Sequence, residues 1–158
     1  MRKVEDYIIN CETLLIMPYG DNMSKVYEYD EILIVTSSVL TIVKNSCLYF
    51  GSSLAGRQAG TKALMNCNVK VPIIIEDSNN IIIFPTNSDR NSNCYWVSYN
   101  NLLKYTKTSN KGSLLYFKQN NKIEVDIKYN IIDNQVIRCI KLEAIINKRK
   151  KYSLVSEK

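Results

Sequence analysis

The chain has 158 residues, 46% of them hydrophobic and 23% charged, a composition that fits one globular domain and excludes a disordered chain. Its formal net charge is +6 and it contains no histidine, so the commonest general base and the commonest metal ligand are missing. The longest apolar runs, residues 32–35 and 81–85, are far shorter than the roughly 20 residues that cross a bilayer.

Short apolar runs between polar clusters predict strands separated by turns. In the first third of the chain these runs are residues 14–17, 32–35 and 39–43. Further on, turn-forming residues between Ile-rich or alternating arms predict two hairpins and a single strand. The hairpins are 71–76 with 81–84, joined by Asp77-Ser78-Asn79-Asn80, and 114–118 with 122–128, joined by Gln119-Asn120-Asn121; the single strand is 95–99.

Two segments predict helices. Residues 53–66 contain no proline and only one β-branched residue, and Ser52 or Ser53 stands where an N-cap is needed. In residues 131–149 apolar side chains recur at every fourth position, which predicts an amphipathic helix. These side chains are Ile132, Val136, Ile140 and Ala144, with Ile137 beside them.

We therefore expect an α+β fold made mostly of antiparallel hairpins, with two helices. Residues 1–150 would form a single domain and residues 151–158 a basic C-terminal tail. Because Glu5 and Asp6 stand where an export signal needs an apolar segment, we expect a cytoplasmic chain without a membrane partner. The five cysteines are widely spaced without a CxxC pair, and we expect them to be reduced.

Charge is unevenly distributed along the chain. Residues 1–31 carry three basic and seven acidic side chains, whereas residues 32–75 carry four basic ones and residues 90–123 carry six, both without an acid. A surface that binds nucleic acid needs such a block, because each neutralised phosphate releases counterions and a nearby carboxylate opposes this. The plainer interpretation, a basic surface that only faces solvent, stays open.

The glycine-rich stretch Gly51 to Gln58 has the glycine spacing of a phosphate-binding loop. Arg57 and Gln58 replace the lysine and the hydroxyl that this loop requires, which argues against an NTPase. Gly56 and Gly60 leave one helix face nearly bare, at ~1 kcal/mol each relative to alanine. Tight packing inside the domain explains this face as well as close approach of a partner subunit or a DNA backbone does.

Basic, amide and hydroxyl side chains on both predicted helices and in the loop after residue 84 are candidates for contacts with DNA bases and phosphates. They are Lys44, Ser52, Ser53, Arg57, Gln58, Lys62, Asn87, Arg90, Arg138 and Lys141. Strand alternation puts Trp96 on the opposite face from Tyr95, so we expect Trp96 in the core. The acidic pairs at residues 76–77 and 124–126 have no nucleophilic partner, and we expect no catalysis, metal or cofactor.

Residues 42–61, with the run FGSSLAGRQAGT, resemble the signature of the ComK family of competence transcription factors. Two later pieces resemble the family in the same order: residues 83–86 followed by 94–98, and residues 129–130 followed by 134–138. The resemblance implies a sequence-specific activator of DNA-uptake genes with RNA polymerase as a partner. It also implies binding to paired A-rich and T-rich boxes, largely from the minor groove, by dimers that pair into tetramers.

The sequence departs from the family pattern in one respect, and two alternative functions stay open. Family members commonly run further, to an FMLYP-like element that a proteolytic adaptor recognises; the sequence lacks this element, which argues against adaptor-controlled proteolysis. The leading alternative is a degenerate paralogue that acts through mixed oligomers, with the acidic N-terminal block as an interaction surface. A nuclease is a weaker alternative, because it needs a cluster of metal-binding carboxylates.

Overall fold

The computed structural model describes the backbone of residues 1–156 and the side chains of residues 1–152. Within this part of the chain ten strands and three helices follow one another, so the predicted α+β class is confirmed. They are β1 (Arg2–Val4), β2 (Thr13–Pro18), β3 (Ser24–Glu28), β4 (Ile32–Val35), α1 (Val39–Tyr49), α2 (Leu54–Met65), β5 (Ile73–Glu76), β6 (Ile81–Pro85), β7 (Trp96–Ser98), β8 (Leu102–Lys107), β9 (Ser113–Phe117), β10 (Asn121–Val125) and α3 (Tyr129–Ser156).

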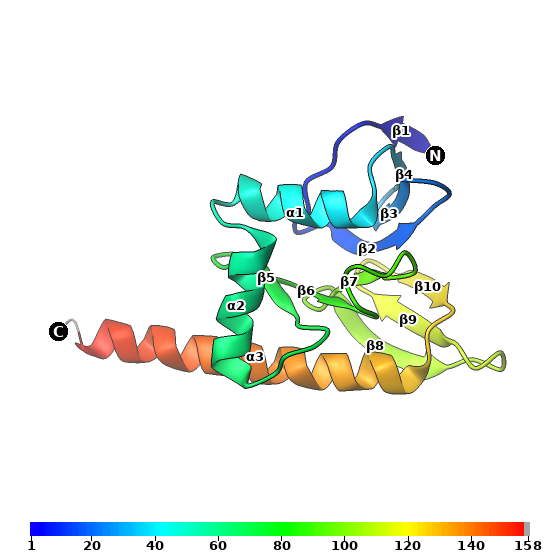
Figure 1. Ribbon diagram of the computed structural model, residues 1–158. Helices are drawn as coiled ribbons and strands as arrows, with labels where there is room; N and C mark the ends of the chain where they lie inside the picture. Colours follow the sequence, from blue (N-terminus) through cyan, green and yellow to red (C-terminus); the bar gives the residue numbers. More distant parts are fainter. Residues whose placement is uncertain (157–158) are drawn as a thin grey trace.

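The strands form two sheets. A seven-stranded sheet has the order β1-β4-β3-β2-β7-β6-β5, and a three-stranded sheet has the order β10-β9-β8. All pairings are antiparallel except that of β1 with β4. In Figure 1, α1 lies across one side of the larger sheet and α3 runs along the opposite side, with its C-terminal end extending past the rest of the fold. No helix in residues 1–156 is long and apolar enough to cross a membrane.

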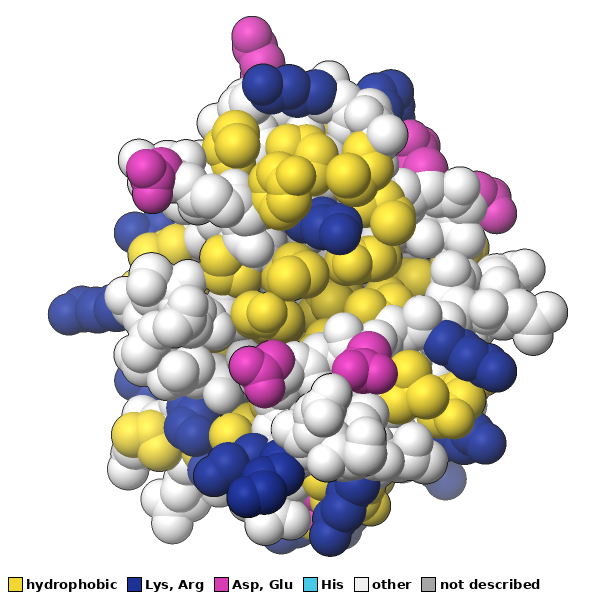
Figure 2. All heavy atoms as spheres, turned by 90° about the vertical axis from the view of Figure 1, so that its right-hand side faces the viewer, with side chains coloured by type: hydrophobic (Ala, Val, Ile, Leu, Met, Phe, Trp, Pro, Cys, Tyr) yellow, Lys and Arg dark blue, Asp and Glu magenta, His cyan; other side chains and the backbone are white. Residues whose placement is uncertain are grey.

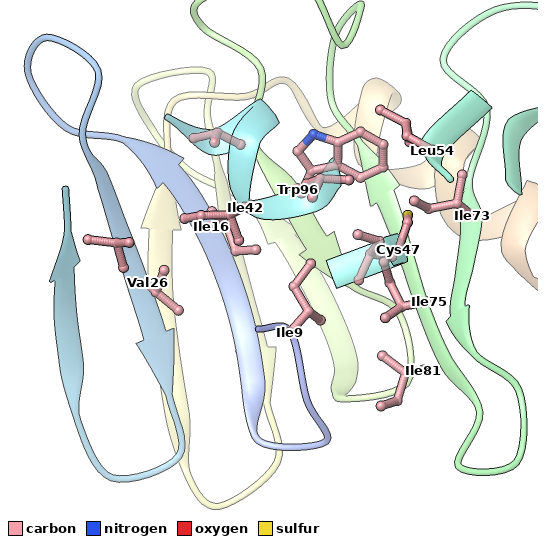
Figure 3. Close-up of a cluster of buried hydrophobic side chains, with 14 of the residues drawn as sticks. Ile9, Ile16, Val26, Ile42, Cys47, Leu54, Ile73, Ile75, Ile81 and Trp96 are labelled. Atoms are coloured by element: carbon pink, nitrogen blue, oxygen red, sulfur yellow. The ribbon is translucent and has the colours of Figure 1, made fainter. Parts of the chain in front are cut away.

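The two sides of the seven-stranded sheet bury separate hydrophobic clusters. The first contains side chains of the sheet together with Ile42 and Cys47 from α1 and Leu54 from α2 (Figure 3). Trp96 belongs to this cluster and is 1% exposed, which confirms its predicted place in the core. The second cluster joins the other side of the sheet to the three-stranded sheet and to α3. The three-stranded sheet therefore buries one of its faces only.

The predicted strand at residues 39–43 is wrong, because these residues form the first turns of α1. The Ser38 hydroxyl accepts a hydrogen bond from the Thr41 amide at 3.2 Å and so caps the helix. Buried side chains then recur at helical spacing; they are Val39, Ile42, Val43, Ser46 and Cys47. Taken alone, the short β-branched run fits a strand equally well. The helical spacing of α1, a helix that was not predicted, can be recognised only when residues 39–49 are considered together.

The predicted helix at residues 53–66 is confirmed as α2. Ser53 caps it, since its hydroxyl accepts a hydrogen bond from the Gly56 amide at 2.9 Å. Asn66 ends the helix in the left-handed region, with φ of 54°. Both predicted hairpins form as well, β5 with β6 and β9 with β10.

The last helix is longer than predicted and buries a different face. It begins at Tyr129 and continues to Ser156, so the first residues of the predicted tail extend it, while Glu157 and Lys158 lie outside the described residues. Ile140 is 52% exposed and Ile137 43%, although both belong to the predicted apolar face. The fully buried apolar side chains are Ile132, which the prediction included, and Cys139 and Leu142, which it did not. The face was misassigned because an inward-pointing glutamine, Gln135, lies on the buried side.

Candidate nucleic-acid interface

A groove of about 380 Å³ lies between α2, the segment that follows it and the loop after β6. It brings together four of the predicted contact residues, from two segments far apart in the sequence: Gln58 and Lys62 of α2, and Asn87 and Arg90 of the loop. The remaining lining residues are Asn68, Val69, Lys70, Val71, Pro85, Ser88 and Asp89.

The groove carries more positive than negative charge. Lys62, Lys70 and Arg90 supply three cations and Asp89 one carboxylate. The Gln58 side-chain amide donates a hydrogen bond of 2.8 Å from Nε2 to Asp89 Oδ2, which joins α2 to the loop. Because the lining also offers amide groups, this groove has the chemistry to contact both phosphates and base edges.

Two α3 side chains form hydrogen bonds with backbone carbonyls of the groove lining. Gln135, 2% exposed, donates hydrogen bonds from Nε2 to the Lys70 carbonyl at 2.8 Å and to the Pro85 carbonyl at 2.6 Å. Arg138 donates from Nη1 to the Val69 carbonyl at 2.8 Å and to the Lys70 carbonyl at 3.2 Å. Lys70 itself has a φ of +50°, an uncommon conformation for a lysine. Gln135 and Arg138 therefore position the segment that presents Lys70.

The small-residue face of α2 is open. Ala55, Gly56, Ala59 and Gly60 are all exposed, and a Cβ added at Gly60 would meet no atom within 4 Å. Tight packing inside the domain therefore does not explain this face. Helical spacing places Ala55 and Ala59 beside Lys62, on the groove side of α2, and Gly56 and Gly60 on the far edge of this face.

Arg57 lies apart from the groove lining. Its Nε, like the Trp96 Nε1, is buried without a hydrogen-bond partner among the described residues. The Arg57 charge also acts on Cys47 of α1: burial raises the pKa of the Cys47 thiol, and Arg57 opposes that rise. Arg57 therefore stands where α2 meets α1.

The other predicted contact residues occupy separate places. Ser52 and Ser53 lie at the N-terminus of α2, Lys44 is exposed on α1 and Lys141 is exposed on α3. Sequence reasoning did not single out Lys70, Asp89 or Gln135. Lys70 could have been predicted as a contact residue, because it lies in the block without acids at residues 32–75. No sequence signal predicts a role for Gln135, which faces inward only because of tertiary packing.

A second hollow, about 360 Å³ in volume, opens between the two sheets and is lined by Met17, Tyr95, Val125 and neighbouring residues. Figure 2 shows a patch of apolar side chains in the middle of one face of the molecule and more Lys and Arg side chains in the lower half of the view than in the upper half. Lys25 lies over the Tyr27 ring, 5.1 Å from its centroid. Burial, and then the Asp126 carboxylate and Tyr27, raise the pKa of the Tyr95 phenol, so these groups are close neighbours.

Within the described residues, no three Asp, Glu or Cys side chains gather as a metal site would require. The fold is of the α+β class, and its basic, amide-lined groove has the chemistry that contacts with a polyanion require.

The family model described as "ComK protein" matches residues 4–151, and the chain belongs to this family. The chain is 36% identical over 138 residues to a protein named "Competence transcription factor" from Bacillus subtilis (strain 168), and the match covers 85% of this chain and 72% of that protein. No solved structure matches the chain significantly.

Proposed function

We propose that the protein is a transcriptional activator of competence genes that binds paired A/T-rich boxes in double-stranded DNA, largely through the minor groove, with RNA polymerase as a partner. Family membership and the likeness to the competence transcription factor support this function. Action on DNA places the protein in the cytoplasm, at the nucleoid, and requires neither catalysis nor a cofactor.

The observation that carries the proposal is the convergence of Gln58, Lys62, Asn87 and Arg90 in one groove. The minor groove of A-tracts is narrow and strongly negative, and it attracts inserted arginine and lysine side chains. Arg90 is exposed on the polar loop and Lys62 is exposed on α2. In this arrangement Arg90 enters the DNA groove while Lys62 and Lys70 neutralise the flanking phosphates.

The test is fluorescence anisotropy on two duplexes of equal length, one with paired A- and T-tracts and one with a G/C-rich scramble. We expect the wild type to prefer the A/T duplex by about a hundredfold or more, and competition by a minor-groove ligand to displace it. The double variant Lys62→Gln/Arg90→Gln should lose this preference. The matched control is Arg2→Gln/Lys3→Gln, which removes two exposed cations from β1, at the opposite edge of the sheet from β5.

Equal and weak binding of both duplexes by the wild type would contradict the proposal. The degenerate-paralogue alternative would then lead, and mixing with a full-length relative would test it through the formation of mixed oligomers.

The proposal includes self-association, because two paired DNA boxes are bound most simply by a two-fold symmetric dimer. The hollow between the sheets suits a second copy of this chain. Met17 and Val125 supply apolar surface to its lining and Glu124 and Asp126 supply acids, while Lys25, which pairs with Met17 in the strand register, lies beside it over the Tyr27 ring. In a two-fold interface every contact occurs twice, and we propose that one of these repeated contacts joins Lys25 of each copy to Glu124 and Asp126 of the other.

A charge exchange tests this surface. Lys25→Glu should weaken association measured by sedimentation velocity, and adding Glu124→Lys and Asp126→Lys in the same chain should restore it. Unchanged association in Lys25→Glu would remove the hollow from the interface.

A further inference from the structure

The outer face of the three-stranded sheet carries a row of two lysines and one tyrosine. Tyr116 of β9 stands directly opposite Lys104 of β8 and Lys122 of β10 in the strand register. All three side chains therefore lie on the same face of the sheet. The Lys104 Nζ lies 4.5 Å and the Lys122 Nζ 5.5 Å from the centroid of the Tyr116 ring.

This face is the one that the fold leaves to solvent. The alternate residues Leu115 and Phe117 of β9 are at most 1% exposed and belong to the second hydrophobic cluster. Lys104 and Lys122 are exposed, and Tyr116 is half-buried between them. The row is thus presented by paired strands whose other side is anchored in the core, which fixes its geometry.

The two lysines have no carboxylate partner. Among the described residues, the ion pairs join Arg2 to Glu31 and Lys150 to Asp77. The acid on this face, Glu124, pairs in register with Leu114 rather than with Tyr116. Two ammonium groups over one ring repel each other, and an anion placed between them removes that repulsion.

The surroundings extend the positive charge. Lys107 lies over the ring of Tyr129 at the start of α3, 5.5 Å from its centroid, and Lys118 is exposed at the β9–β10 turn. These lysines all come from residues 90–123, the block without an acid. Cation–π contact alone explains each lysine–tyrosine pair, but it does not explain why lysines accumulate on this sheet, where among the described residues Glu124 forms no ion pair with any of them.

We propose that the row Lys104–Tyr116–Lys122 is a second phosphate-contacting site, which binds the DNA backbone without reading sequence while the α2 groove discriminates between sequences. This inference rests on the proposed function. Lysine ammonium groups are point charges that suit phosphate oxygens, and the Tyr116 hydroxyl adds a hydrogen-bond donor between them. The site would hold the duplex to the protein beyond the groove.

Salt dependence distinguishes this role from a structural one. Each lost phosphate contact reduces the slope of log K against log [salt] by about 0.9. Lys104→Gln/Lys122→Gln should therefore lower the slope by about 1.8 and weaken binding by roughly tenfold or more at 0.1 M salt. The loss should be equal for the A/T-tract duplex and the G/C-rich scramble, so that the preference between them is retained.

Two further variants keep the test decisive. Lys104→Arg/Lys122→Arg keeps both charges and should keep the slope, which shows that the loss arises from charge. Arg2→Gln/Lys3→Gln removes the same charge from β1 and should leave the slope nearly unchanged. Circular dichroism should show that all three double variants are folded.

The outcomes separate the two proposals. An unchanged slope in Lys104→Gln/Lys122→Gln, with preference for the A/T duplex intact, overturns the second site and leaves the proposed function standing. Absence of any preference in the wild type overturns the proposed function itself. A loss confined to the A/T duplex also overturns the inference, because the row would then take part in sequence discrimination.

Discussion

Replacing Gly60 by alanine should stabilise the protein. A glycine inside a helix is less favourable than alanine by about 1 kcal/mol. A Cβ at Gly60 would meet no atom within 4 Å, so no clash offsets this gain. We expect Gly60→Ala to raise the free energy of unfolding by about 0.5–1 kcal/mol, or roughly 2–4 °C in Tm for a chain of this size.

Gly56 provides the matched comparison on the same helix. A Cβ there would lie 3.1 Å from Ser53 Oγ and 3.2 Å from Ser52 Oγ. It would therefore press on the hydroxyl that caps α2, and such a cap contributes about 1 kcal/mol. The same gain in helix propensity is thus offset at Gly56, and Gly56→Ala should leave the stability unchanged or lower it.

Urea denaturation followed by circular dichroism measures both variants, and anisotropy on the A/T duplex gives a second reading. We propose that the DNA backbone also approaches this open face of α2, so that Gly60→Ala, which adds a methyl group there, should bind DNA severalfold more weakly. A fall in stability would refute the argument from open space. Raised stability with unchanged affinity would show that DNA does not approach α2 through this face.

Three other predictions test the interface and its support. Arg57 lies outside the groove but one helical turn from Gly60, at the edge of the open face of α2, so Arg57→Ala should weaken specific DNA binding while circular dichroism shows an intact fold; unchanged affinity would remove Arg57 from the interface. Gln135→Leu should lower the free energy of unfolding in urea by about 1–3 kcal/mol, because the buried hydrogen bond to the Pro85 carbonyl is lost, while the Lys70 carbonyl keeps Arg138 as a donor; an unchanged free energy of unfolding would contradict this. Burial and the Glu143 carboxylate raise the pKa of Tyr99 from 10.0 to about 12, so its contribution to stability is fully present below pH 10 and is lost as the pH rises toward 12. Titration at 295 nm should show tyrosine ionisation delayed in the folded protein relative to the protein in urea, and coincident curves would contradict the shift.

Several features of the fold followed from local sequence. The Asn-rich turn before β6 and the Gln119-Asn120 turn before β10 contain residues that tolerate positive φ, and Asn80, Gln119 and Asn120 have φ of 53°, 61° and 59°. The two hairpins were predictable for this reason. Ser53 likewise marked the start of α2, because capping depends only on residues within one turn.

The candidate site was predictable in part. Lys62 and Arg90 could be named because blocks without acids are visible in the sequence, and the run FGSSLAGRQAGT indicated the family. That these two side chains line the same groove could not be inferred, since α2 and the loop are joined by the Gln58–Asp89 hydrogen bond across 31 positions.

Tertiary packing decided what remained. Residues 39–43 fit a strand locally, and they form a helix because Ile42, Val43 and the later turns of α1 bury one continuous face against the sheet. The buried side of α3 was set in the same way, by Gln135 meeting the carbonyls of Lys70 and Pro85. Hydrogen bonds and apolar contacts between distant segments have no local signature. The sequence therefore determined the turns, the cap, the charge blocks and the family, and the tertiary structure alone decided which side chains meet.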